Sequence, residues 1–157
     1  MRFTLVFIVI TLLVALGAWL ILRQLVVTWV SPEPETIGVQ NGRLAPCPDT
    51  PNCVSSYADD EQHAIEPIRY EGPQADARDR LLGAVRSMPR SFVETTEDDY
   101  VHVIFRSPTL GFYDDTELYF AEPGVIHVRS AARLGQGDMG ANRKYVEEIR
   151  QRFASAS

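Results

Sequence analysis

The sequence predicts an α+β domain: an antiparallel sheet of about five strands with two helices on one face, preceded by one N-terminal transmembrane helix. Three observations predict this architecture. An uncharged apolar run follows Arg2, four segments of alternating polarity form two hairpins, and two segments of helical period flank the hairpins. The expected order of elements within the domain is β-α-β-β-β-β-α.

The N-terminal anchor is predicted from residues 3–22, which carry no charge. At helical rise this run spans roughly 30 Å, the thickness of the hydrocarbon core. Trp19 and Arg23 are typical interfacial residues. A cleaved signal peptide is the alternative, with a small-residue site at 15–17, but the apolar run continues well past it. We therefore expect residues 1–30 to remain as a transmembrane anchor and juxtamembrane segment.

Charge indicates on which side of the membrane the domain lies. Arg2 gives a preference for a cytoplasmic N-terminus, which places the domain outside the cytoplasm, in the periplasm if the source is a Gram-negative bacterium. After Arg23 the chain has 13 basic and 21 acidic side chains, a net charge of −8. Such a domain does not bind nucleic acid unspecifically, and anionic lipid headgroups would repel it. The expected partners are the membrane, through the helix, and a protein at the membrane.

The first part of the domain follows a segment without periodicity. Residues 31–45 are expected to form a linker, and residues 46–157 the globular domain. Residues 64–70 predict a short edge strand, because Pro67 cannot donate to a ladder. Residues 73–88 predict an amphipathic helix that starts at a proline and stops at the next one.

Two hairpins and a helix complete the domain. Residues 91–96 and 100–107 alternate around an acidic turn, and residues 113–120 and 125–132 alternate around Pro123-Gly124. Apolar residues then recur at helical spacing up to Phe153, in a helix that we expect Asp138 to cap.

A cluster of charged and polar residues surrounds the second hairpin. Its register predicts Glu117 close to Arg129 and Asp115 close to residue 131. The cluster could be a set of structural ion pairs or a binding site; catalysis by paired carboxylates is disfavoured. The glycines at 135–140 match a dinucleotide signature, but only 17 residues remain after Gly140, too few for the required strand. The candidate residues are Asp114, Asp115, Glu117, Arg129, Ser130, Arg133, Asp138, Asn142 and Arg143.

Cys47 and Cys53 are the two cysteines of the chain, and we expect them to form a disulfide. Their short loop contains two prolines, which stiffen the chain and lower the entropic cost of closure. The bond would hold a candidate loop site of Asn52, Ser55 and Ser56. Two reduced, buried cysteines are the alternative if the domain faces the cytoplasm. A zinc site with Asp49 and His63 is a third possibility, but the spacing is wider than in usual zinc sites. No metal or cofactor is expected.

Three stretches together resemble the domain of unknown function 1499 family over about residues 44–153. These are PCPDTPNCVSS, GFYDDTE and VRSAARLGQGDMGANRKYVEEIR. The chain departs from the family pattern at Ala132, where serine is usual, and at Tyr145, where arginine is frequent. The resemblance implies a shared residue pattern, but it implies no catalytic residue or cofactor.

Three functions fit these observations. The first is a membrane-anchored, non-enzymatic binding or assembly module. The second is an enzyme acting on a small anionic substrate at a face formed by Arg129, Arg133, Asp138 and Arg143. The third is a thiol or metal sensor at Cys47 and Cys53. The lack of a recognisable nucleophile and base favours the first.

Overall fold

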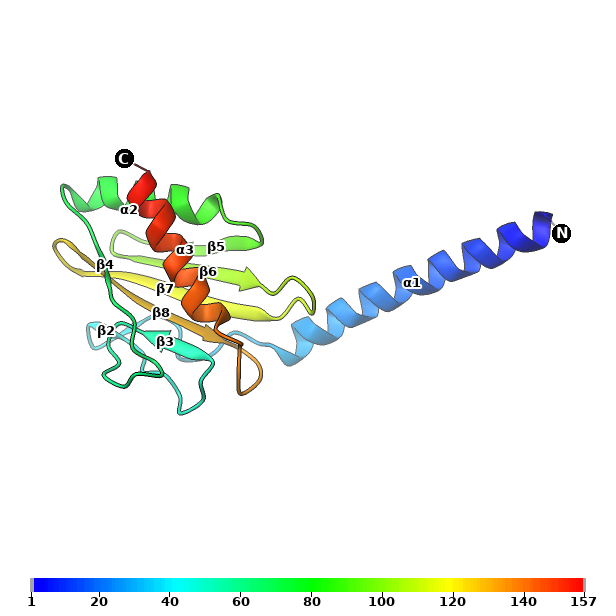
Figure 1. Ribbon diagram of the computed structural model, residues 1–157, viewed down its shortest axis with the longest axis horizontal. Helices are drawn as coiled ribbons and strands as arrows, with labels where there is room; N and C mark the ends of the chain where they lie inside the picture. Colours follow the sequence, from blue (N-terminus) through cyan, green and yellow to red (C-terminus); the bar gives the residue numbers. More distant parts are fainter. Residues whose placement is uncertain (1, 157) are drawn as a thin grey trace. The chain divides into compact units, whose positions relative to one another are not determined.

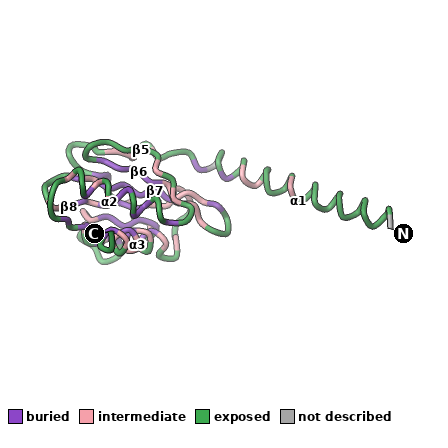
Figure 2. Tube along the Cα trace, turned by 90° about the horizontal axis from the view of Figure 1, so that it is seen from above, coloured by how far each residue is buried: buried purple, intermediate pink, exposed green. Residues whose placement is uncertain are grey.

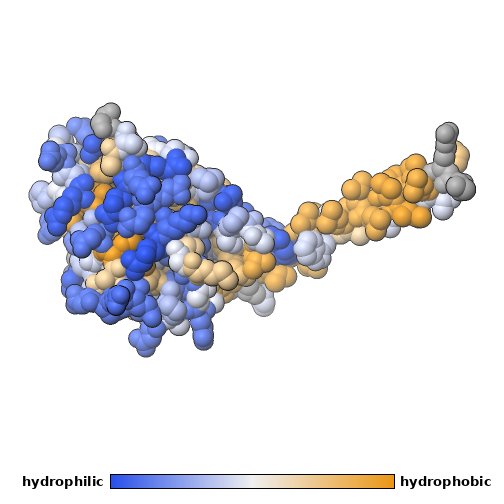
Figure 3. Space-filling view, viewed as in Figure 1, coloured by the Kyte–Doolittle hydropathy of each residue, from blue (hydrophilic) through white to orange (hydrophobic). Residues whose placement is uncertain are grey.

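The computed structural model describes residues 2–156 and divides the chain into two compact units, the first ending at Pro32 and the second beginning at Glu33. The first unit is the helix α1 (Arg2–Val30), of 29 residues. Within its segment Phe3–Trp29 the most apolar 18 residues have a mean hydropathy of 3.0, and none of these 18 is buried. By length and composition it can cross a membrane, as predicted, and Figure 3 shows its apolar side chains along its length.

The second unit is built on one antiparallel sheet, which confirms the α+β fold class (Figure 1). The sheet has six strands in the order β3-β8-β7-β6-β5, and β4 also pairs with β8. Because β3 and β4 follow each other along one side of β8, β4 lies at an edge, as predicted. It has only two residues, however, and the predicted strand of residues 64–70 is shortened because Pro67 and the two residues before it are not part of a strand. The strands are β3 (Cys53–Ser55), β4 (Ile68–Arg69), β5 (Ser91–Thr96), β6 (Tyr100–Arg106), β7 (Tyr113–Glu122) and β8 (Val125–Ala132).

Two helices cover one face of this sheet. They are α2 (Gln74–Arg86), which begins directly after Pro73, and α3 (Ala141–Ser155). Their apolar stripes, with Leu81 and Ile149 fully buried, pack on residues of β6, β7 and β8 to form the hydrophobic core. Burial is concentrated in these central strands, whereas α1 is largely exposed (Figure 2).

The central hairpin has the register that the sequence predicted. Glu117 lies opposite Arg129, and Asp115 lies opposite Ala131. β7 is two residues longer than expected, and an irregularity between Tyr119 and Glu122 absorbs the extra length next to the turn. The predicted pairing of Glu117 with Arg129 is correct because this irregularity lies between the turn and the charged residues.

The structure differs from the expectation over residues 33–45. This segment, expected to be a linker, belongs to the second compact unit and contains a hairpin of β1 (Val39–Gln40) and β2 (Arg43–Leu44). Asn41 and Gly42 form its turn with φ of 52° and 75°, the left-handed conformations that a tight hairpin requires. The Asn-Gly pair is a sequence signal for such a turn, but strands of two residues have no measurable period.

The disulfide between Cys47 and Cys53 is present. The two sulfurs are 2.07 Å apart and the Cα atoms 5.7 Å apart. Cys53 is the first residue of β3, a strand that the sequence did not predict, and its side chain is buried. The bond therefore fixes the loop that leads into the edge strand of the sheet.

We expect the Cys47→Ser/Cys53→Ser variant to lose about 2 kcal/mol of unfolding free energy, because the closed loop is short. Urea unfolding of the full chain in detergent micelles, followed by circular dichroism, measures the loss. Wild-type protein with reductant should unfold at the same urea concentration as the variant. Equal stability of the oxidised wild type and the variant would contradict a stabilising role for the bond.

Candidate functional site

The predicted charged cluster is divided between the two faces of the sheet. Successive side chains of a strand point to opposite faces, so the neighbours Arg129 and Ser130 point apart. Ser130 hydrogen-bonds Asn142 of α3 and therefore faces the helices. Arg129 binds Glu117 of β7 on the opposite face. The structure thus forms two polar groups from one cluster in the sequence.

A buried carboxylate, Glu117, is the centre of the first group. Its Oε2 accepts a hydrogen bond of 3.0 Å from Arg129 Nη1. Its Oε1 accepts bonds of 2.9 Å from the hydroxyl of Tyr100 and 2.7 Å from the backbone N–H of Gly38. Glu117 is 0% exposed and Arg129 is 5% exposed. Opposite charge and three donors together offset the loss of hydration that burial of this carboxylate costs.

Asp115 is the second carboxylate on this face. Arg133 donates two hydrogen bonds to it, from Nε at 2.7 Å and from Nη2 at 2.8 Å, and His102 Nε2 lies 2.8 Å from its Oδ1. Burial raises the pKa of Asp115, but the hydrogen bonds from His102 and Arg133 outweigh it, so the pKa lies below its usual value. Asp115 is therefore an anion at neutral pH, held by two partners.

The segment of residues 33–45 reaches this polar face. Gly38 bonds Glu117, and β2 contacts both β7 and β8. Leu44 and Ala45 are themselves buried. This segment and the neighbouring strands therefore enclose the ion pair of Arg129 and Glu117.

On the helix face, Asn142 connects a network of hydroxyl, amide and carboxylate groups. Its Oδ1 accepts a bond of 2.6 Å from Ser130, whose hydroxyl is also 2.7 Å from that of Thr116. Its side-chain amide donates to the backbone carbonyl of Asn52 and to Asp138. Asp138 also accepts the backbone N–H groups of Gly140 and Asn142. The N-cap residue of α3 is Gly140 and not Asp138 as expected, because the chain makes a turn at residues 139 and 140 before the helix begins.

Asp114 is the carboxyl whose environment the sequence did not reveal. It is buried beside Tyr145 of α3, whose hydroxyl bonds it, and Asp138 lies close enough to act on it. Burial, and secondly the charge of Asp138, raise the pKa of Asp114 to about 7. Only the packing of α3 against β7 brings these groups together, so no pattern in the sequence indicated the shift.

The loop residues Asn52, Ser55 and Ser56 bind the backbone of neighbouring segments. Asn52 donates to the carbonyl of Gly135 at 2.7 Å, and Ser55 Oγ accepts the N–H of Tyr57. Ser56 Oγ accepts the N–H of Val128. Arg143 similarly donates to the carbonyls of residues 62 and 64. These contacts join the disulfide loop, the edge strand and α3.

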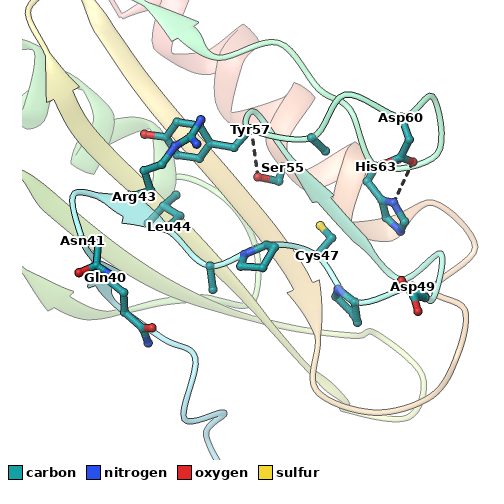
Figure 4. Close-up of a pocket in the computed structure, with 14 residues that line it drawn as sticks. Gln40, Asn41, Arg43, Leu44, Cys47, Asp49, Ser55, Tyr57, Asp60 and His63 are labelled. Atoms are coloured by element: carbon teal, nitrogen blue, oxygen red, sulfur yellow. Dashed lines mark hydrogen bonds and ion pairs between the residues drawn. The ribbon is translucent and has the colours of Figure 1, made fainter.

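The structure contains a pocket that the sequence did not indicate, with a volume of about 670 Å³. The β1–β2 hairpin, the disulfide loop and the segment from Ser55 to His63 enclose it (Figure 4). Arg43 and Tyr57 lie at one end, and Asp60 and His63 lie at the other. The lining also includes the apolar residues Leu44, Ala45, Pro46 and Pro48, and the polar residues Gln40, Asn41, Asp49 and Ser55.

Each end of the pocket has a defined charge. The Arg43 guanidinium lies 4.5 Å from the centre of the Tyr57 ring, whose other neighbour is His127, stacked at 4.1 Å. His63 Nδ1 lies 2.8 Å from an oxygen of Asp60. The hydrogen bond from His63 lowers the pKa of Asp60, so this carboxylate is an anion at neutral pH. The pocket therefore combines a cationic end with an anionic one.

Within residues 2–156 no group of three or more His, Cys, Asp or Glu side chains is placed to hold a metal ion. The zinc alternative at Cys47 and Cys53 is ruled out while their sulfurs are bonded to each other.

We expect Arg129→Met to lower the free energy of unfolding by about 3 kcal/mol, because it leaves the buried Glu117 charge without its partner. The double variant Glu117→Gln/Arg129→Met should recover much of the loss, since glutamine keeps an acceptor and has no charge. Arg78→Met removes an exposed pair with Asp98 and should cost far less. Urea unfolding measures all three; equal losses in the single and double variants would contradict the assignment.

Asp114 makes stability depend on pH. Its pKa is raised in the folded state, so its contribution is fully present below pH 4 and is lost as the pH rises through about 7. Asp114→Asn should therefore be more stable than wild type at pH 8, by ~3 kcal/mol, and similar to it at pH 5. Urea unfolding at the two pH values tests this. A constant difference between the proteins would show that Asp114 does not titrate in this range.

The comparison with known proteins gives one match. No curated protein and no solved structure matches the chain. The family model described as "Protein of unknown function (DUF1499)" matches residues 43–153, which include both polar groups, the disulfide and most of the pocket. The chain therefore belongs to the DUF1499 family.

Proposed function

We propose that this protein is a single-pass, membrane-anchored binding module whose ligand site is the pocket between the β1–β2 hairpin and the disulfide loop. The main observation that supports this proposal is that the pocket has opposite charges at its ends and apolar residues between them. Its volume of about 670 Å³ is within the range of small-ligand sites. A ligand that fits has an acidic or acceptor group for Arg43 and a basic or donor group for Asp60.

The contacts of the candidate residues favour binding over catalysis. The enzyme alternative places Arg129, Arg133, Asp138 and Arg143 on one surface. Arg129 and Arg133 bind carboxylates on one face of the sheet, whereas Asp138 accepts a backbone N–H of the first turn of α3 on the other. In the pocket, both ring nitrogens of His63 have partners, Asp60 at one and the Thr50 carbonyl and Gln62 at the other. Such groups are suited to holding a shape rather than to transferring a proton.

The disulfide supports a location outside the cytoplasm, because such bonds persist in oxidising compartments. With the anchor predicted to have its N-terminus in the cytoplasm, the domain would face the periplasm of a Gram-negative cell. The thiol-sensor alternative has less support, since Cys53 is buried and a sensor cysteine needs access to its reagent.

A photo-reactive amino acid at Gln40, an exposed pocket residue, tests the proposed site in native membranes. We expect irradiation to give a discrete adduct in the full-length chain. Arg43→Ala should reduce its yield several-fold without changing the melting temperature, because the arginine contributes to the ligand contact and not to the core.

The matched control carries the same amino acid at Gln151, an exposed position of α3 away from the pocket. It should not give the adduct. Identical products from both positions, or a yield at Gln40 that does not depend on Arg43, would overturn the assignment of the pocket.

A further inference from the structure

We infer that one end of the sheet, where β6 ends and β7 begins, contacts the phospholipid surface of the membrane that holds the anchor. We call this the membrane end; it consists of residues 107–112, residues 133–140, Arg90, Arg106 and Tyr113. This surface is separate from the pocket, and the inference does not depend on the proposed function.

The length of the chain restricts the distance between the domain and the bilayer. The 29 residues of α1 extend about 43 Å at helical rise, close to the full thickness of a bilayer with its headgroups. The helix ends at Val30 and the compact unit begins at Glu33. Three residues extend at most about 11 Å, so Glu33 must remain within that distance of the end of α1.

The electrostatic contacts of Glu33 place it near the membrane end of the sheet. The hydrogen bond with Asp115 is the main cause of the raised Arg133 pKa, and the charge of Glu33 contributes to it. The backbone N–H of Arg133 bonds the carbonyl of Tyr113, the first residue of β7. The point of attachment is therefore close to the loops that begin at these two residues.

Exposed apolar side chains occur at the tips of these loops. Leu110 is 49% exposed in the β6–β7 loop, and Met139 is fully exposed in the loop before α3. Since Asp114 pairs with Ala132, the two loops leave the sheet at the same level. Single exposed apolar residues are common, but two loops at the same end of the sheet that each carry one are suited to contact with the membrane interface.

Met139 lies in a tight turn, closed by the hydrogen bond from the Ala141 N–H to the Asp138 carbonyl, in a position that a large apolar residue seldom occupies. Its φ is +54°, in the left-handed region that disfavours side chains other than glycine, asparagine and aspartate. Because the side chain is exposed, no packing within the domain offsets this cost. A contact outside the domain, such as the acyl region next to the headgroups, would account for a large apolar residue at this position.

Cations and an aromatic ring lie beside the apolar tips. The guanidinium groups of Arg106 and Arg133 lie 5.2 Å and 5.3 Å from the ring centre of Tyr113. Arg90 is exposed, and its carbonyl accepts the N–H of Arg106. Arginine and tyrosine are typical of the headgroup level, where they bind phosphates. Arg133 is paired with Asp115, and Asp138 adds an acidic group to the same end. In this acidic domain the charge contact with a phospholipid surface therefore depends on the exposed Arg90.

Site-specific quenching in nanodiscs tests this orientation. Both native cysteines are bonded to each other, so an introduced cysteine is the single thiol available for labelling. An environment-sensitive fluorophore at Leu110→Cys or Met139→Cys should be quenched several-fold by phospholipids with a nitroxide near the headgroup. Ala121→Cys, exposed near the opposite end of β7, and Gln151→Cys are the matched controls and should show little quenching.

A second variant pair tests the role of charge. In nanodiscs with anionic lipid, Arg90→Glu should reduce quenching at Leu110 several-fold, whereas Arg69→Glu on the distant strand β4 should not. Equal quenching at all four labelled positions, or none at Leu110 and Met139, would overturn the inference. Loss of the pocket adduct at Gln40 would leave it unaffected, because the two surfaces share no residue.

Discussion

The arrangement of the domain depends on the neutralisation of two carboxylates buried in the sheet face opposite the helices. An antiparallel sheet with helices on one side can leave its other face in water, yet Asp115 and Glu117 are 1% and 0% exposed. Their donors come from β6, from β8 and the residue that follows it, and from the segment before β1. Strand register, pairing order and the position of the N-terminal segment must therefore all be correct before these charges are compensated.

The sequence predicted the parts of this arrangement that are local. Pro123-Gly124 and the alternation around it were sufficient to align Glu117 with Arg129, because hairpin register follows from the turn. The β1–β2 hairpin was missed although Asn41-Gly42 marks it. Its strands are two residues long, and contacts with β7 and β8, rather than the strand propensity of its own residues, stabilise it. β3 was missed for the same reason: it is three residues long and owes its conformation to β8.

The candidate site was less predictable than the fold. The sequence predicted one cluster, because its charged residues are close along the chain. The side chains of a strand alternate between the two faces of the sheet, however, so Arg129 and Ser130 point to opposite faces. The raised pKa of Asp114 depends on α3, which returns to β7 from about thirty residues away. The pocket combines the β1–β2 hairpin with a loop on the far side of the disulfide. Each feature requires the tertiary structure, which no local pattern encodes.

The segment of residues 33–45 links three properties that would otherwise be independent. Its Gly38 donates to the buried Glu117, its hairpin forms one wall of the pocket, and its first residue follows the membrane helix after two residues. Displacement of this segment would remove a donor from Glu117 and open the pocket at the same time. A buried carboxylate that loses a donor is costly, so the ion pair favours the closed pocket. The sheet charges thereby stabilise the binding surface without contacting a ligand.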